Sequence, residues 1–398
     1  MDPVTPPQRR PRDRKAQLAS LAAGLFRARG YHGVGINDIA AAAGVTGPAI
    51  YRHFADKQAI LAYVVLSGID DMNAATAEAL ADGVPTGDQL DRLLTLLAAQ
   101  AVERREIAAL WRWEGRHLPA DERREIRRRS GATLGAWTKA LLRRRPELPE
   151  ADAELLCWAT LSVFGSVSVH RTSVAKKRFV KLLTELASAV LDATLPESPV
   201  PASPEPPGLG TPSRREQVLA AATELFAERG FHAVSMEDIG AASGIAGPSV
   251  YRHFPSKAAL MVAIGHRAAD RLAVAAERAL KASDERDALR RLAASYVHTL
   301  LRTPELLVSF TSSSGARVSM PDRDKTELLR VQRDYVGQWI ALLAAARPEL
   351  PAREVKIIVH AALTIANDLS RTRRVSVRPH LEEELTALLH AVLGISSR

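Results

Sequence analysis

The sequence has very little cysteine and no long apolar segment. Cys157 is the one cysteine among 398 residues, which excludes a disulfide framework and favours a reducing compartment. No uninterrupted apolar run approaches the roughly 18 residues that a membrane-spanning helix needs. The first residues also lack the apolar core of a secretory signal. We therefore expect a cytoplasmic protein without a membrane partner.

The signatures of common enzymes are missing as well. The sequence contains no glycine-rich phosphate loop, no HExxH, no GxSxG and no prominent pair of carboxylates. Cys157 and the scattered histidines do not have the spacing of metal ligands. We predict no catalytic residues, no metal site and no cofactor.

Acidic residues are too few to balance the basic ones. Lys and Arg number 54 against 45 Asp and Glu, which gives a formal net charge of +9. This excess is typical of proteins with a polyanionic partner, although it says nothing about the fold. Residues 1–13 are rich in Pro and Arg, and they form either a solvated tail or a basic arm that contacts phosphates.

One short segment occurs twice. GVTGPAIYRHFADK at Gly44–Lys57 returns as GIAGPSVYRHFPSK at Gly244–Lys257, 200 residues later. Over the wider windows Gly30–Lys57 and Gly230–Lys257, 15 of 28 positions are identical. RPELP and a tryptophan recur further on at an offset of 202 residues, so the duplicated unit is about 200 residues long.

Helical periodicity and stop signals predict an all-α fold with two similar halves. Each half begins with a small three-helix head, and a larger helical body follows. The predicted domains are a head at 14–60, a body at 61–195, a linker at 196–213, a head at 214–260 and a body at 261–398. In the heads we predict helices at 14–29, 36–43 and 47–53, and again at 214–229, 236–243 and 247–253. In the first body we predict them at 60–81, 87–105, 107–115, 120–145, 149–171 and 176–193. The linker has seven prolines and no helical period.

The repeated segment has the residues that a helix-turn-helix needs. Gly44 permits a tight turn, and small residues in the next helix let its backbone approach base edges. Ile50 and Phe54 fall on the inward face, as do Val250 and Phe254. The Tyr, Arg, His and Lys side chains between them can donate to phosphates or to a guanine edge. For any one of these residues ordinary packing is a sufficient explanation, but not for the whole repeated set.

The pattern FxxRGYHxVGIxDIAxAAGVTGPAIYRHFxDK resembles the DNA-binding domain of the TetR family of bacterial repressors, and so does its second copy. The resemblance implies an operator in double-stranded DNA as partner. It also implies that the last two long helices of each body form a four-helix bundle with a second unit, and that a body binds a small effector. The implied DNA contacts are Thr46, Gly47, Pro48, Ala49, Tyr51, Arg52, His53 and Lys57 in the first head. In the second head they are Ala246, Gly247, Pro248, Ser249, Tyr251, Arg252, His253 and Lys257.

Two fused units depart from the usual single unit of this family. The chain is similar to tandem members known in actinobacteria, such as a repressor of a mammalian-cell-entry lipid-uptake operon. We expect an intrachain pseudo-dimer in which Asp121–Arg171 packs against Asp322–Arg374, with the two heads ~34–36 Å apart. The alternative is a homodimer with four heads. Because Thr46 becomes Ala246 and Ala49 becomes Ser249, we expect related but unequal half-sites.

The first body is rich in tryptophan. We predict that an apolar effector, of fatty acyl or sterol type, contacts Trp111, Trp113, Glu114, Trp158 and Phe164 and releases the DNA. The alternative for these residues is core and interface packing. We expect Trp137 and Trp339 to lie between the two halves. A repressor is the leading hypothesis; a ligand-independent architectural DNA-binding protein and a transcriptional activator are the alternatives.

Overall fold

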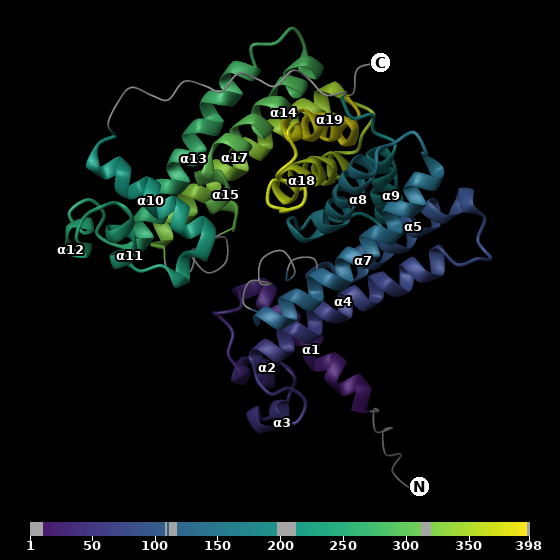
Figure 1. Ribbon diagram of the computed structural model, residues 1–398, viewed down its shortest axis with the longest axis horizontal. Helices are drawn as coiled ribbons and strands as arrows, with labels where there is room; N and C mark the ends of the chain where they lie inside the picture. Colours follow the sequence, from purple (N-terminus) through teal and green to yellow (C-terminus); the bar gives the residue numbers. More distant parts are fainter. Residues whose placement is uncertain (1–10, 108–109, 111–117, 197–211, 312–319, 396–398) are drawn as a thin grey trace.

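The computed structural model describes residues 11–107, 110, 118–196, 212–311 and 320–395. Every regular element in these ranges is a helix (Figure 1). The predicted all-α fold is therefore confirmed for the part of the chain that the structure describes. Its two halves follow the same plan, one helix after another.

Each head is a bundle of short helices that leads directly into a long one. In the first half these are α1 (Pro11–Arg29), α2 (Ile36–Ala42), α3 (Gly47–Tyr51) and α4 (Lys57–Ala79). In the second half they are α10 (Arg214–Arg229), η3 (Phe231–Ala233), α11 (Met236–Ala242), α12 (Gly247–Val250) and α13 (Lys257–Ala279). The long fourth helix begins at a capped position, since Asp56 accepts a hydrogen bond from the amide of Ala59 at 2.7 Å and Ser256 does the same for Ala259. Both long helices thus begin at a residue whose side chain satisfies a backbone amide of the first turn.

The bodies consist of longer helices. The first contains α5 (Thr86–Glu103), α7 (Ala120–Arg144), α8 (Glu150–Gly165), η2 (Ser166–Ser168) and α9 (Lys176–Leu191). The second contains α14 (Glu285–Arg302), α15 (Pro304–Thr311), α17 (Asp322–Ala346), α18 (Ala352–Leu369) and α19 (Leu381–Leu393). The α-helix predicted to run to residue 171 ends at Gly165, where a 3-10 turn replaces it. Most of the helix predicted at 107–115 lies outside the described residues.

Each head has its own apolar core. Ile50 and Val250 are fully buried, and Phe54 and Phe254 are nearly so. All four therefore face inward, as their spacing predicts. A third apolar cluster is shared by the two bodies. The heads thus fold around small local cores, whereas one continuous core joins the bodies.

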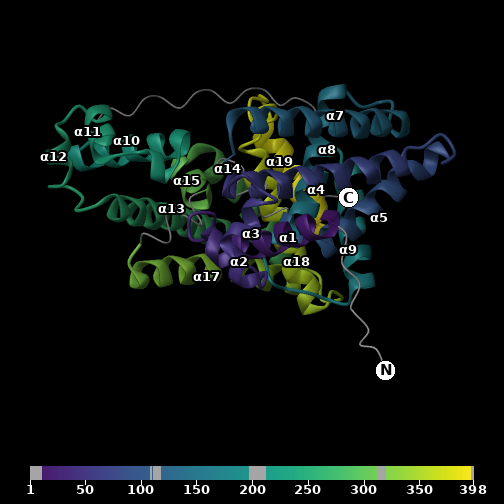
Figure 2. The same cartoon turned by 90° about the horizontal axis from the view of Figure 1, so that it is seen from below.

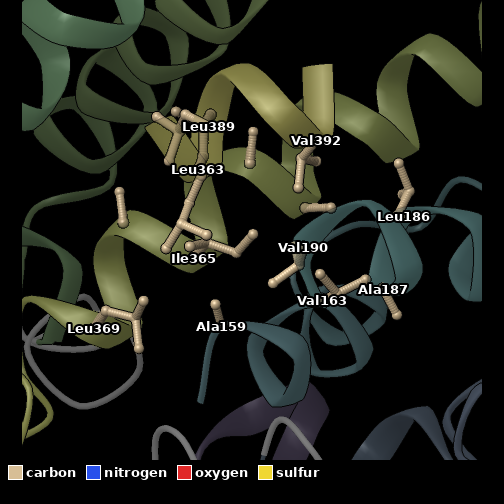
Figure 3. Packing of buried hydrophobic residues seen from close by; sticks show 14 of the residues in the cluster. Ala159, Val163, Leu186, Ala187, Val190, Leu363, Ile365, Leu369, Leu389 and Val392 are labelled. Atoms are coloured by element: carbon tan, nitrogen blue, oxygen red, sulfur yellow. The ribbon is translucent and has the colours of Figure 1, made fainter. Parts of the chain in front are cut away.

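The two halves are joined by a four-helix bundle. Helix α8 packs against α18, and α9 packs against α19. Ala159 and Val163 of α8 and Val190 of α9 lie beside side chains of α18 and α19, among them Ile365 and Val392 (Figure 3). Because these contacts are apolar and buried, the hydrophobic effect holds the two halves together.

The bundle agrees with the resemblance but only partly with the predicted ranges. The predicted contact of 121–171 with 322–374 is right for α8 and α18. It is wrong for α7 and α17, which pack along α4 and α13 of their own halves (Figure 2). Helices α9 and α19 take their place in the bundle.

The prediction that Trp137 and Trp339 lie between the halves was wrong. The indole Nε1 of Trp137 donates a 2.8 Å hydrogen bond to Thr76 Oγ1 on α4. The ring of Trp339 lies edge-on to Tyr296 of α14, with 5.7 Å between ring centroids. Because α7 and α17 lie along helices of their own bodies, the indoles that they carry are buried within each half.

Candidate nucleic-acid interface

A sharp turn joins the two helices of each predicted DNA-binding motif. Gly44 follows the end of α2 with φ +63°, and Gly244 follows α11 with φ +70°. Residues other than glycine rarely adopt this left-handed backbone conformation, so the turn depends on glycine. Pro48 and Pro248 then stand in the first turn of α3 and α12, where no intrahelical donor is lost.

The small residues of the recognition helices have a structural reason besides access to DNA. A Cβ placed on Gly47 would lie 3.0 Å from Oδ1 of Asn37, and one on Gly247 would lie 3.2 Å from Cγ of Glu237. Both neighbours belong to the preceding helix, so glycine permits the close packing of the two helices. The sequence pattern had indicated only the approach to DNA for these glycines.

The start of α11 is fixed by a capping box. Ser235 Oγ accepts a hydrogen bond from the amide of Asp238 at 3.0 Å, and the Asp238 carboxylate accepts one from the amide of Ser235 at 2.8 Å. These contacts with Ser235 lower the pKa of Asp238. In the first head Gly35 provides only the backbone half of this arrangement, with a 2.7 Å bond to Asp38. The motif is thus oriented by local hydrogen bonds in both heads.

The predicted contact residues are displayed in the same way in both heads. Tyr51 is 56% exposed and Tyr251 is 49% exposed, which is unusual for such large rings. Arg52 and Arg252 follow them and are also exposed. Helix α3 ends at Tyr51 and α12 at Val250, earlier than predicted. The remaining predicted contacts lie in or beside these helices, are partly or fully exposed and match position by position: Thr46, Gly47, Pro48, Ala49 and His53 with Ala246, Gly247, Pro248, Ser249 and His253. The two heads therefore present equivalent faces, and the assignment of these residues to DNA stays a prediction.

Lys57 and Lys257 are placed differently from the other predicted contacts. The ammonium of Lys57 donates to the backbone oxygens of Tyr31 and Val34, at 2.8 and 2.9 Å, and lies 4.2 Å from the centroid of the Tyr31 ring. Lys257 donates to Val234 at 2.7 Å and lies over the ring of Phe231. Burial lowers the pKa of Lys257. Both lysines thus tie the long fourth helix to the loop before the motif.

The two heads meet at a pair of histidines that the sequence pattern did not single out. The rings of His32 and His232 lie 4.8 Å apart between centroids. Each stands edge-on to the aromatic residue before it, Tyr31 or Phe231. Both follow the repeated RG dipeptide, but a repeat by itself does not reveal that its two copies touch.

The predicted effector residues are only partly visible. Trp111, Trp113 and Glu114 lie outside the described residues. Trp158 and Phe164 are both on α8 and pack against the core that the bodies share. Since they are six residues apart, they point in directions about 120° apart around the helix. The structure thus places these two residues in core packing, and a common pocket for all five stays a prediction.

Other kinds of site find no support in the described ranges. No group of three or more metal-binding side chains gathers there. None of the helices in these ranges combines the length and apolar character needed to cross a membrane.

Comparison with known proteins gives the same result for both heads. The family model of bacterial regulatory proteins of the tetR family matches residues 18–64 and 218–264. The transcriptional activator FasR of Mycolicibacterium smegmatis is 41% identical over 78 residues, which are 19% of this chain and 36% of the relative. The transcriptional repressor KstR2 of Rhodococcus jostii is 30% identical over 110 residues, 28% of this chain and 54% of the relative.

The chain thus spans between about a third and about half of the length of these curated relatives. Among solved structures, the TetR-family regulator PfmR from Thermus thermophilus is 23% identical, with a TM-score of 0.39. The match covers 46% of this chain and 99% of PfmR. The two matches fall on equivalent elements, so each head is similar to the helix-turn-helix domain of the bacterial regulatory proteins of the tetR family.

Proposed function

We propose that this chain is a transcriptional repressor that binds one operator with both heads. The observation that carries the proposal is the equivalence of α3 and α12. They expose the same residue types at most of the same positions, and one bundle joins their two bodies. Two equivalent recognition helices, held by one helical bundle, suit two half-sites about one helical turn of DNA apart. In this proposal one chain provides both DNA-binding heads that a dimer would otherwise supply, and it acts in the cytoplasm.

The two recognition helices differ where a hydroxyl changes place. Thr46 corresponds to Ala246, and Ala49 corresponds to Ser249. A hydroxyl can donate to or accept from a base edge, whereas a methyl group favours a thymine methyl. The proposed operator therefore consists of two related but unequal half-sites.

An apolar effector of fatty acyl or sterol type completes the proposal. It binds the first body more tightly in the released form than in the DNA-bound form, and so shifts the population toward release. The resemblance to tandem regulators of lipid uptake supports this class. The contact between His32 and His232 would have to change, since release requires a different spacing of the heads.

A second candidate is an activator that uses the same heads. The observation that favours it is the 41% identity to the activator FasR, which is higher than the identity to the repressor KstR2. A promoter assay distinguishes the two, because repression predicts more transcript when the gene for this chain is deleted and activation predicts less.

The test of operator binding compares DNA from upstream of the protein's own gene with random DNA at one salt concentration. A specific regulator should prefer its operator by about 10³-fold or more. A preference below about tenfold with a steep salt dependence would instead support an architectural DNA-binding protein. Sedimentation of the complex checks the stoichiometry, and two chains per operator would contradict the single-chain arrangement.

A further inference from the structure

The second body has a cationic groove that lies outside the predicted effector pocket. It runs between α13 and α14, is open to solvent and has a volume of about 640 Å³. Val274, Ala275 and Ala279 give it an apolar floor. Four arginines line it: Arg271 and Arg278 on α13, and Arg291 and Arg302 on α14. The groove thus combines an apolar surface with guanidinium groups on both walls.

The first half has acidic residues where this groove has arginines. Helices α4 and α13 have equal lengths, as do α5 and α14, so their positions can be paired without gaps. Asp71 corresponds to Arg271, Glu78 to Arg278 and Glu103 to Arg302. In the first half each of these acids is in an ion pair, with Arg104, Arg92 and Lys176 respectively. The second half has therefore reversed the charge at three positions of one surface.

The reversal leaves two arginines where the first half has an ion pair. Arg92 donates to Glu78 at 2.9 Å across the two helices. The corresponding residues of the second half are Arg291 and Arg278. Arg291 pairs with Asp287 on its own helix, and Arg278 makes no ion pair with any residue that the structure describes. The charge of Arg278 is therefore not balanced by a neighbouring carboxylate in this part of the chain, and a bound anion would stabilise it.

We propose that this groove binds a small molecule with at least two phosphate groups and an apolar part. Guanidinium groups bind phosphate oxygens in a two-point geometry. Arg271 and Arg278 are seven residues apart on α13, which separates their Cα atoms by ~10 Å and matches a chain of phosphates better than a single one. The apolar part of the ligand lies on Val274.

The position of the groove argues against the DNA backbone as its occupant. Arg278 follows Lys257, where the second head ends, by 21 residues of continuous helix. This corresponds to ~30 Å along α13, and Arg271 at the near end of the groove is ~20 Å from Lys257. A groove at these distances from the end of the head lies on the body, where a soluble ligand can reach it while the heads bind DNA.

A chain of ion pairs leads from the groove to the second head. Arg271 pairs with Glu305 at 3.0 Å. Glu305 is also 4.0 Å from Arg267, which pairs with Glu216 of α10 at 2.6 Å. A phosphate that draws Arg271 away from Glu305 therefore alters the contact between body and head. This second step rests on the proposed function, because it requires that the head binds DNA.

The test measures binding of tripolyphosphate and of coenzyme A to the full chain by isothermal titration calorimetry, without DNA. Arg278→Glu restores the arginine–glutamate pair of the first half and should weaken binding at least about tenfold. Arg127→Glu makes the same charge change at an exposed position of α7 and should leave binding within about twofold. Far-ultraviolet circular dichroism checks that both variants fold.

The outcomes separate this proposal from the proposed function. No binding of either probe, or equal loss in both variants, overturns the groove as a site even if operator binding is intact. Binding to vesicles with anionic phospholipids but not to the soluble probes also overturns it in favour of a membrane surface. If coenzyme A binds and the operator affinity changes less than about twofold, the site stands and the route to the head is wrong. A change of about fivefold or more, absent in Arg278→Glu, supports both.

Discussion

Arg178 of the first half and Glu354 of the second form a two-point ion pair across the bundle. Nε of Arg178 donates to Oε1 of Glu354 at 2.8 Å, and Nη2 donates to Oε2 at 2.5 Å. The Glu354 side chain is only 5% exposed. The hydrogen bonds from Arg178 lower the pKa of Glu354. A buried carboxylate of one half is thus stabilised mainly by a guanidinium of the other.

Replacement of Arg178 by Ala should therefore destabilise the contact between the halves. Loss of one partner leaves the Glu354 carboxylate buried and unpaired. Because Arg178 is 39% exposed and partly screened, we expect a loss of ~1–3 kcal/mol in the free energy of unfolding. Denaturant unfolding of the two single variants and of Arg178→Ala with Glu354→Ala measures the coupling. Additive effects would contradict the direct pairing.

Acid should weaken the same contact. Burial, followed by the neighbouring His360 and Arg105, lowers the pKa of His170 to about 3. Burial and Lys356 lower the pKa of His360 to about 4. The two rings stack at 5.0 Å between centroids across the halves. Since an unfolded histidine binds its proton near pH ~6.5, the stability is fully present above that pH and falls as the pH drops, by on the order of 2 kcal/mol per histidine at pH ~5.

Unfolding by denaturant at about pH 7.5 and about pH 5 checks this dependence. The double variant His170→Gln with His360→Gln should lose less stability on acidification than the wild type. His266→Gln changes a histidine of α13 away from this cluster and serves as the control. The prediction fails if the wild type and the double variant lose the same stability between the two pH values.

The heads were predictable from sequence because their determinants are local. Gly44 marks a turn that requires positive φ. Asp56 caps the following helix by accepting a hydrogen bond from the amide of Ala59, three residues later. Such features depend on neighbours within a few residues. The inward positions of Ile50 and Phe54 follow from helical spacing for the same reason.

The contacts between distant parts were not predictable from local patterns. Trp137 was assigned to the wrong surface because its direction depends on which helices lie beside α7, and its indole is bonded to α4. Arg178 and Glu354 are 176 residues apart in the chain. No local sequence pattern indicates that two residues so far apart form an ion pair. The charge reversal at Arg278, in contrast, left a signal in the sequence. It becomes visible when the comparison of the two halves continues past the heads into α4 and α13.

Replacement of the exposed arginine in either head should weaken operator binding. Arg52→Ala and Arg252→Ala each remove one charge from the predicted interface. We expect about tenfold weaker binding for each. The slope of the salt dependence should also be shallower by about one unit, because each variant neutralises one phosphate fewer and so releases fewer counterions from the DNA. Fluorescence anisotropy at several salt concentrations measures both quantities. Arg127→Ala, on the body, should leave both unchanged, and an equal effect there would mean that only total charge matters.

Exchange of the small residues should exchange the half-site preference. Ala49→Ser with Thr46→Ala gives the first head the residues of the second at both differing positions of the reading edge. This variant should bind a symmetric operator, built from two copies of the second half-site, at least about tenfold more tightly than the wild type does. Competition between the two symmetric operators and the natural one measures the preference. If all three compete equally for both proteins, these positions do not read bases.

A Lys57 variant can show whether this lysine stabilises the first head or contacts DNA. Its ammonium is bonded to the carbonyls of Tyr31 and Val34 and lies over the Tyr31 ring, so Lys57→Met leaves these carbonyls without that donor. We expect the first head to lose ~1–3 kcal/mol of stability for this reason. Lys257→Met should have a similar effect in the second head. Hydrogen exchange of each head measures the local loss, and salt-dependent anisotropy measures operator binding. A structural lysine predicts faster exchange with an unchanged salt slope, whereas a phosphate contact predicts unchanged exchange with a slope that is shallower by about one unit.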